Sequence, residues 1–281
     1  MNKKIGIVGA GTMGRGVAQV FAQSGYDVLL HDISAQTLTD SKSDIFSNLR
    51  MQRMFQKEAI SPEEGLSHIQ FIDQIETLGE AKIIIENISE SVSEKKALYQ
   101  RLANICPADC LYLVNTSCIS ITEIAATMPI PENIIGVHFM NPAPMIKAVE
   151  VIRGFHTADD TVNSVIALLE SVGKEGIIVK DFPGFVSNRI SHLMMNEAAF
   201  IVQDQVADPA SVDAIFKKCY GHKMGPLETA DLIGLDTVVD SLRILYESFQ
   251  DCKFRCCPLL KKMVAAGCLG RKNKKGFYLY E

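Results

Sequence analysis

The sequence predicts an α/β fold in which helices cover a mostly parallel sheet, followed by a smaller all-helical domain. In the first half, short β-branched runs alternate with helix-like stretches, and a glycine-rich turn follows the first run. From Phe185 onward, apolar residues recur at helical spacing. The pattern changes at Asp181-Phe182-Pro183-Gly184, where Pro removes a backbone donor and Gly permits a sharp turn. We expect an α/β domain over residues 1–182 and a helical domain over residues 183–281.

The apolar runs of the first domain are expected to form the strands of the sheet. These runs are Ile5–Val8, Val28–His31, Gln70–Ile72, Ile83–Ile85, Leu111–Asn115, Ile134–Phe139, Ala148–Ile152 and Gly176–Lys180. A long polar stretch separates the second run from the third, and its apolar residues recur at roughly helical spacing. This spacing predicts a helical excursion from the sheet over about residues 34–64.

Composition excludes several classes of protein. The 281 residues are 47% hydrophobic and 22% charged, which suits a soluble globular chain with a large core. A net charge of −5 argues against nucleic-acid binding, and no apolar run approaches the ~18–20 residues of a membrane span. The eight cysteines include no Cys-x-x-Cys and have no His at ligand spacing, so we expect reduced thiols and no metal site. No export signal is recognisable, and we therefore expect a cytoplasmic protein.

A G-x-G-x-x-G motif directly follows the first predicted strand and opens an amphipathic helix. Gly9 would make the tight turn, Gly11 would let the backbone approach a pyrophosphate, and Gly14 would let the helix pack closely on the strand. At the end of the second strand, Asp32 can accept both hydroxyls of an adenosine ribose and would repel a 2′-phosphate. The motif therefore predicts a Rossmann-type site for NAD rather than NADP. The expected cofactor-binding residues are Gly9, Ala10, Gly11, Thr12, Met13, Gly14 and Asp32.

Polar side chains lie in or just after the later strands, near the edge where open α/β sheets bind ligands. They are Ser117, His138, Glu150 and, at the start of the helical domain, Asn188. An alcohol that NAD oxidises must lose a proton, and histidine suits this because its unperturbed pKa of ~6.5 lies near neutral pH. A carboxylate on the other ring nitrogen would fix the tautomer, while Ser and Asn can hydrogen-bond the reacting oxygen. On spacing alone, an ordinary strand-end histidine and a solvated glutamate remain equally open interpretations.

Ordered motifs along nearly the whole chain carry a resemblance to a known family. They are Asn115-Thr116-Ser117, His138–Met145 with Lys147–Val151, Lys180–Arg189, Met224–Glu228, and Gly270–Lys272 with Gly276–Tyr278. In these motifs the sequence resembles the 3-hydroxyacyl-CoA dehydrogenase family in its short, 3-hydroxybutyryl-CoA dehydrogenase form. The resemblance implies that His138 is the general base, that Glu150 orients it, and that Ser117 and Asn188 bind the substrate oxygen.

The same resemblance implies an acyl-CoA substrate and a homodimer formed through the helical domain. It also implies further cofactor contacts at Glu90, Lys95, Asn115, Ser117, Asn141 and Lys272. In the family, the helical excursion supplies a Ser and a basic residue to the nucleotide part of CoA. The candidates here are Ser47, Arg50, Arg53 and Lys57, and the alternative is a solvated helical face.

The chain departs from the family pattern at Cys118, where Ser is usual, and at Met140, where a second aromatic is usual. The segment Lys253–Leu260 and the stretch 224–241 resemble a polyketide-pathway branch that oxidises a hydroxyacyl unit on an acyl carrier protein. That tether stays open as an alternative to CoA. A second alternative is a non-catalytic dinucleotide-binding sensor, because fold alone does not fix function. A β-hydroxyacid dehydrogenase with a lysine base ranks low, because the first lysine of the helical domain is Lys217.

Overall fold

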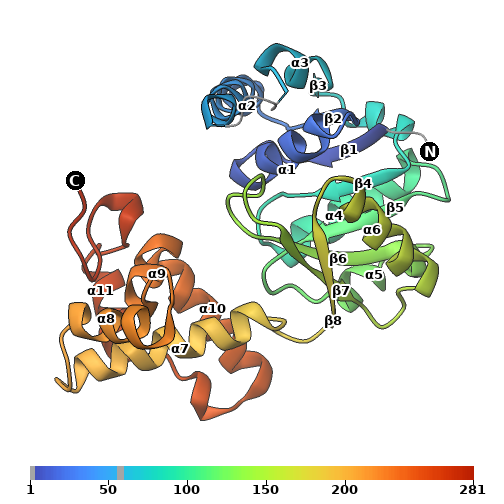
Figure 1. Ribbon diagram of the computed structural model, residues 1–281. Helices are drawn as coiled ribbons and strands as arrows, with labels where there is room; N and C mark the ends of the chain where they lie inside the picture. Colours follow the sequence, from blue (N-terminus) through green and yellow to red (C-terminus); the bar gives the residue numbers. More distant parts are fainter. Residues whose placement is uncertain (1–3, 56–59) are drawn as a thin grey trace. The chain divides into compact units, whose positions relative to one another are not determined.

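The computed structural model describes residues 4–55 and 60–281 (Figure 1). The chain divides between Asp181 and Phe182 into two compact units. The first unit contains all the named strands of the described chain, and the second consists of helices joined by short connections. The predicted fold class is therefore confirmed.

An eight-stranded sheet lies at the centre of the first unit, in the order β3-β2-β1-β4-β5-β6-β7-β8. The strands are β1 (Lys4–Val8), β2 (Asp27–His31), β3 (Ile69–Ile72), β4 (Ile83–Glu86), β5 (Leu111–Asn115), β6 (Ile134–Phe139), β7 (Ala148–Arg153) and β8 (Glu175–Lys180). From β3 to β6 all pairs are parallel; β7 runs antiparallel to β6, and β8 runs parallel to β7. The order from β3 to β6 is that of doubly wound dinucleotide-binding sheets. Every predicted strand is confirmed, with each end within one residue.

Helices and 3-10 turns connect and cover these strands (Figure 1). They are α1 (Thr12–Gln23), α2 (Ala35–Phe55), α3 (Pro62–Ser67), η1 (Ile75–Glu80), α4 (Val92–Ile105), α5 (Ile121–Ala125), η2 (Pro131–Asn133) and α6 (Asp159–Ser171). All residues of β6 are buried, and because successive side chains point to opposite faces, both faces of the sheet are covered there. Each fully buried Ile, Val or Leu on these strands contributes roughly 1.5–3 kcal/mol of hydrophobic stabilisation.

The second unit has its own apolar core. Its elements are α7 (Ser187–Gln203), α8 (Pro209–Tyr220), α9 (Pro226–Ile233), α10 (Leu235–Phe249), η3 (Cys252–Phe254), α11 (Pro258–Ala265) and η4 (Arg271–Asn273). Met195 of α7, Leu242 of α10 and Leu260 of α11 are fully buried in one hydrophobic cluster. No helix among the described residues is both long enough and apolar enough to span a bilayer.

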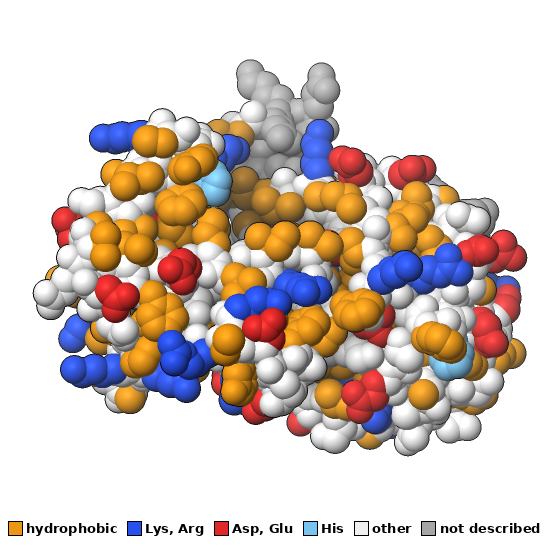
Figure 2. Space-filling view, turned by 90° about the horizontal axis from the view of Figure 1, so that it is seen from below, with side chains coloured by type: hydrophobic (Ala, Val, Ile, Leu, Met, Phe, Trp, Pro, Cys, Tyr) orange, Lys and Arg blue, Asp and Glu red, His pale blue; other side chains and the backbone are white. Residues whose placement is uncertain are grey.

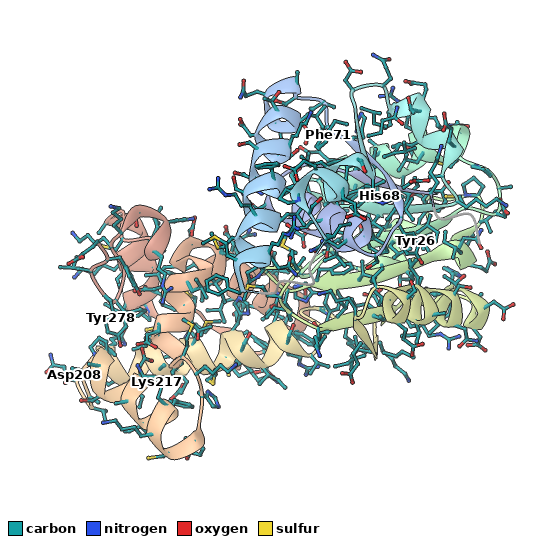
Figure 3. All side chains as sticks on the ribbon, turned by 45° about the horizontal axis from the view of Figure 1, so that its top comes forward. Tyr26, His68, Phe71, Asp208, Lys217 and Tyr278 are labelled. Atoms are coloured by element: carbon teal, nitrogen blue, oxygen red, sulfur yellow. The ribbon has the colours of Figure 1, made fainter. Side chains whose placement is uncertain are left out.

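Two buried carboxylates fasten the C-terminal segment to this helical unit. Asp213 accepts hydrogen bonds from the Tyr278 hydroxyl at 2.7 Å and from the backbone N–H of Leu227 at 2.8 Å. Asp231 accepts from the backbone N–H groups of Phe277 and Tyr278, both at 3.0 Å (Tyr278 is labelled in Figure 3). Because a buried carboxylate is tolerated only when its oxygens are hydrogen-bonded, these contacts fix the path of the tail.

Candidate active site

In the loop between β1 and α1, close backbone contacts require glycine at two positions, and the space around a third glycine is open. Gly9 has φ +91°, and a Cβ there would lie 2.6 Å from the Asn87 carbonyl oxygen. A Cβ on Gly14 would lie 1.7 Å from the Gly9 carbonyl oxygen, so α1 can approach the loop only with glycine here. Around a Cβ on Gly11, no described atom lies within 4 Å. The loop therefore leaves free space at the N-terminus of α1, where backbone N–H groups bind phosphate.

Asp32, directly after β2, is held against this loop. Its Oδ2 accepts a hydrogen bond from the Ala10 N–H at 2.8 Å, and its Oδ1 accepts from the Ser34 N–H at 2.9 Å. Each carboxylate oxygen has a further lone pair. The side chain is thus fixed beside the loop with acceptor capacity left for a ribose, which fits the predicted NAD site.

Ser117, His138 and Glu150 form one hydrogen-bonded chain. The antiparallel register of β6 and β7 places His138 directly opposite Glu150, with Nδ1 2.9 Å from Oε2. The Ser117 hydroxyl, just beyond β5, lies 3.1 Å from His138 Nε2. His138 is 7% exposed and Glu150 is 8% exposed, so little water weakens their interaction. In neutral His138, a carboxylate on Nδ1 favours the tautomer that leaves Nε2 as the proton acceptor.

The connection between β4 and α4, together with the first turn of α4, supplies three polar residues to the same edge of the sheet. The Glu90 carboxylate accepts hydrogen bonds from the turn that carries Ser117, and Lys95 donates to the Asn115 carbonyl oxygen at 3.0 Å. The Asn115 amide nitrogen donates to Asn87 Oδ1 at 2.6 Å. Asn87 was not among the residues predicted for the site. Its position just past the carboxyl end of β4 was the available signal.

Cys118 follows Ser117 in this turn. Burial, and secondarily the negative charge of Glu90, raise the pKa of its thiol to about 12. A neutral thiol is the form expected at physiological pH, so this departure from the usual serine adds no reactive nucleophile to the site.

The resemblance also implied roles for Asn188, Lys272 and Asn141. Asn188, on the first turn of α7, and Lys272, in η4, belong to the second unit, where Lys272 is paired with Asp236. Asn141 belongs to the first unit, is exposed, and is joined to Pro142 by a cis peptide bond. Their roles at the site stay predictions.

The candidates for binding the CoA nucleotide lie on α2. Ser47, Arg50 and Arg53 recur every third residue and are exposed. Arg50 and Arg53 line a surface hollow of about 480 Å³, and the other described lining residues are Phe46, Met54, Pro62 and Glu63. Ser47 is outside that set, and Lys57 lies outside the described residues. No group of His, Cys, Asp and Glu suited to a metal ion occurs within residues 4–55 and 60–281.

Comparison with known proteins covers both units. The NAD-binding domain of 3-hydroxyacyl-CoA dehydrogenase matches residues 4–182, and the C-terminal domain of that family matches residues 184–280. A probable 3-hydroxybutyryl-CoA dehydrogenase of Deinococcus radiodurans is 43% identical, with 99% of this chain and 100% of that protein covered. A 3-hydroxybutyryl-CoA dehydrogenase of Bradyrhizobium diazoefficiens is 40% identical, with 99% and 95% covered.

A solved structure gives the same result. The crystal structure of (S)-3-hydroxybutyryl-CoA dehydrogenase from Ralstonia eutropha matches with a TM-score of 0.94 and 38% identity, covering 100% of both chains. These relatives give no support to the polyketide branch left open by the sequence. The chain belongs to the 3-hydroxyacyl-CoA dehydrogenase family, NAD-dependent oxidoreductases that act on a CH–OH group.

Proposed function

We propose that this protein interconverts short (S)-3-hydroxyacyl-CoA and 3-oxoacyl-CoA thioesters, such as 3-hydroxybutyryl-CoA and acetoacetyl-CoA. The observation that carries the proposal is the hydrogen-bonded chain from Ser117 through His138 to Glu150. Ser117 lies just past the carboxyl end of β5 and His138 lies near the carboxyl end of β6, in the sheet that also carries the glycine loop. The names of the relatives support the short acyl chain.

In the forward direction, His138 Nε2 accepts the proton of the C3 hydroxyl while the C3–H bond breaks. The glycine loop and Asp32 would hold NAD, which would supply the hydride acceptor, so the products would be a ketone, NADH and a protonated His138. The Glu150 carboxylate, 2.9 Å from Nδ1, stabilises the positive ring. Ser117 and Asn188 donate hydrogen bonds to the substrate oxygen as its charge develops. In the reverse direction, the imidazolium returns the proton.

The competing function is a dinucleotide-binding sensor without turnover. A sensor needs the glycine loop but gains nothing from a buried His–Glu pair with a serine on the second ring nitrogen. The test is NADH consumption with acetoacetyl-CoA at micromolar enzyme, together with a titration of NADH fluorescence. We expect steady consumption of NADH; tight NADH binding without consumption would overturn the proposed function.

Asp32 is proposed to set the preference for NAD. Asp32→Asn keeps the acceptor oxygen toward Ala10 or Ser34 but removes the charge that would repel a 2′-phosphate. Hydrogen bonds to charged groups contribute ~1.5–3 kcal/mol, so we expect the affinity for NAD to fall by about 10-fold or more. The ratio of NAD affinity to NADP affinity should also become smaller. Asp27→Asn, an exposed change at the start of β2, is the control. An unchanged ratio of the two cofactor affinities would contradict the assignment.

Arg50 and Arg53 are proposed to bind the phosphates of the CoA nucleotide. Both line the hollow on α2, and guanidinium groups pair well with phosphate. For the Arg50→Ala, Arg53→Ala double variant, we expect the KM for acetoacetyl-CoA to rise about 10-fold with kcat retained. The KM for acetoacetyl-N-acetylcysteamine, which lacks the nucleotide, should stay unchanged. Equal effects on both substrates would contradict this role, and Lys82→Ala serves as the control.

We also propose a homodimer formed through the helical unit. Several large apolar side chains of this unit are exposed. Figure 2, which shows one face of the molecule, has many hydrophobic side chains at the surface. Those of the helical unit include Ile190, Ile215, Tyr220, Leu232 and Tyr246. Sedimentation equilibrium should give twice the mass of the chain. A single-chain mass at micromolar concentration would contradict the proposal.

A further inference from the structure

One carboxylate oxygen holds the whole turn that follows β5. Glu90 Oε1 accepts hydrogen bonds from the backbone N–H of Ser117 at 2.8 Å and that of Cys118 at 3.2 Å, and from the hydroxyl of Thr116. Glu90 comes from the neighbouring β4–α4 connection, 27 residues earlier than Ser117 in the chain. The position of the Ser117 backbone is therefore set by a side chain from outside its own strand.

A buried lysine holds the other side of the same segment. Lys95 is fully buried; it donates to both oxygens of Glu86, at 2.6 and 2.8 Å, and to the Asn115 carbonyl oxygen at 3.0 Å. Its Nζ also lies 3.8 Å from Glu90 Oε2. Glu86 is fully buried at the end of β4, and its Oε1 accepts from the Ile88 N–H at 2.7 Å. A charged lysine at such depth requires fixed anionic and carbonyl partners, so this arrangement is rigid.

The segment held by Lys95 and Glu90 carries the serine that contacts His138. The segment Asn115–Cys118 is held at its start by Lys95 and over its last three residues by Glu90. From it, the Ser117 hydroxyl reaches His138 Nε2 at 3.1 Å. A shift of about 1 Å in a reacting group can reduce a rate by about 100-fold, so the anchoring of this turn bears on turnover.

We propose that Glu90 and Lys95 are positioning residues, which hold the 115–118 segment so that the Ser117 hydroxyl meets His138 and the substrate oxygen. The proposal rests on the function proposed above. The resemblance implies that Glu90 and Lys95 contact the cofactor, and the role proposed here is a different one. Lys95 is fully buried and donates to Glu86 and to the Asn115 carbonyl oxygen, so it acts through the segment that it holds. Glu90, whose side chain is 36% exposed, acts through the same segment.

A double-mutant cycle between Glu90 and Ser117 tests this proposal. If Glu90 acts through Ser117, Glu90→Ala should lower kcat about 10-fold in the native background but less than about 2-fold in the Ser117→Ala background. The dissociation constant of NADH should change less than about 2-fold in either background. Glu94→Ala, at an exposed carboxylate in the first turn of α4, is the matched control.

The conservative variant Glu90→Gln extends the test if the alanine variant folds poorly. A single oxygen of Glu90 accepts the hydrogen bonds from this turn, and the Gln amide retains one such oxygen, so Glu90→Gln should keep kcat within about 3-fold of the native value. Additive effects of the Glu90 and Ser117 substitutions would overturn the proposal, as would weaker NADH binding with kcat intact at saturation. If Ser117→Ala alone leaves kcat unchanged, the proposed function of Ser117 fails instead.

Discussion

Replacing His138 by Ala is expected to lower turnover of acetoacetyl-CoA by ~10²–10⁴-fold, the usual contribution of a positioned acid or base, while NADH still binds. The imidazole has its Nδ1 on Glu150 and its Nε2 beside Ser117, so its removal takes away the proposed proton donor and acceptor. The glycine loop follows β1 and Asp32 follows β2, whereas His138 lies on β6, so NADH affinity should be retained. Steady-state kinetics and a fluorescence titration of NADH measure the two quantities.

Two further variants make the His138 result interpretable. Ala removes the imidazole that pairs with the buried Glu150 carboxylate, and this loss is expected to lower stability. His138→Gln retains a side-chain donor toward Glu150 but cannot accept and return a proton, so it should lose turnover with a smaller loss of stability. His156→Ala, at an exposed histidine, should behave like the native protein. Near-native turnover in His138→Gln would remove this residue from the proton transfer.

Gly14→Ala is expected to abolish tight NAD binding and also to destabilise the first unit. The new Cβ would lie 1.7 Å from the Gly9 carbonyl oxygen, so α1 or the loop must move. Overpacking of this kind costs ~1–3 kcal/mol, and the displaced loop should bind NADH at least about 10-fold more weakly. Thermal denaturation and an NADH titration give the two values.

Gly11→Ala tests cofactor binding by the loop without disturbing the fold. Gly11 has φ −65°, which alanine adopts readily, and a Cβ there meets no described atom within 4 Å. We therefore expect an unchanged melting temperature but weaker NADH binding, because the new methyl group would occupy the space of the pyrophosphate. Native NADH affinity in Gly11→Ala would place the cofactor elsewhere.

The sheet could be predicted closely because its strands are buried on both faces. Such strands are short, continuous β-branched runs bounded by polar turns, and this signal is local in the sequence. The reversed direction of β7 is not local, since it depends on how the chain returns after residue 139. The direct pairing of His138 with Glu150 follows from that antiparallel register. The sequence could therefore suggest both residues for one site but could not establish that they touch.

The Glu86–Lys95 pair shows a different limit of sequence analysis. Lysine and glutamate are seldom fully buried, so a sequence alone gives no reason to place these two inside the protein. Their burial becomes evident only when β4, α4 and β5 are packed together. Asn188 and Lys272 illustrate a third limit, because a role in binding substrate or cofactor depends on contacts that spacing along the chain does not fix.

The most direct test of the proposed chemistry is a crystal structure of the protein with NAD and acetoacetyl-CoA. We expect His138 Nε2 within about 2.6–3.2 Å of the C3 oxygen, with C3 facing the nicotinamide ring. Glu150 should remain on Nδ1, and the Ser117 hydroxyl should contact the same substrate oxygen. A thioester whose C3 oxygen is held by other groups, with His138 beyond hydrogen-bonding reach, would contradict the role assigned to this histidine.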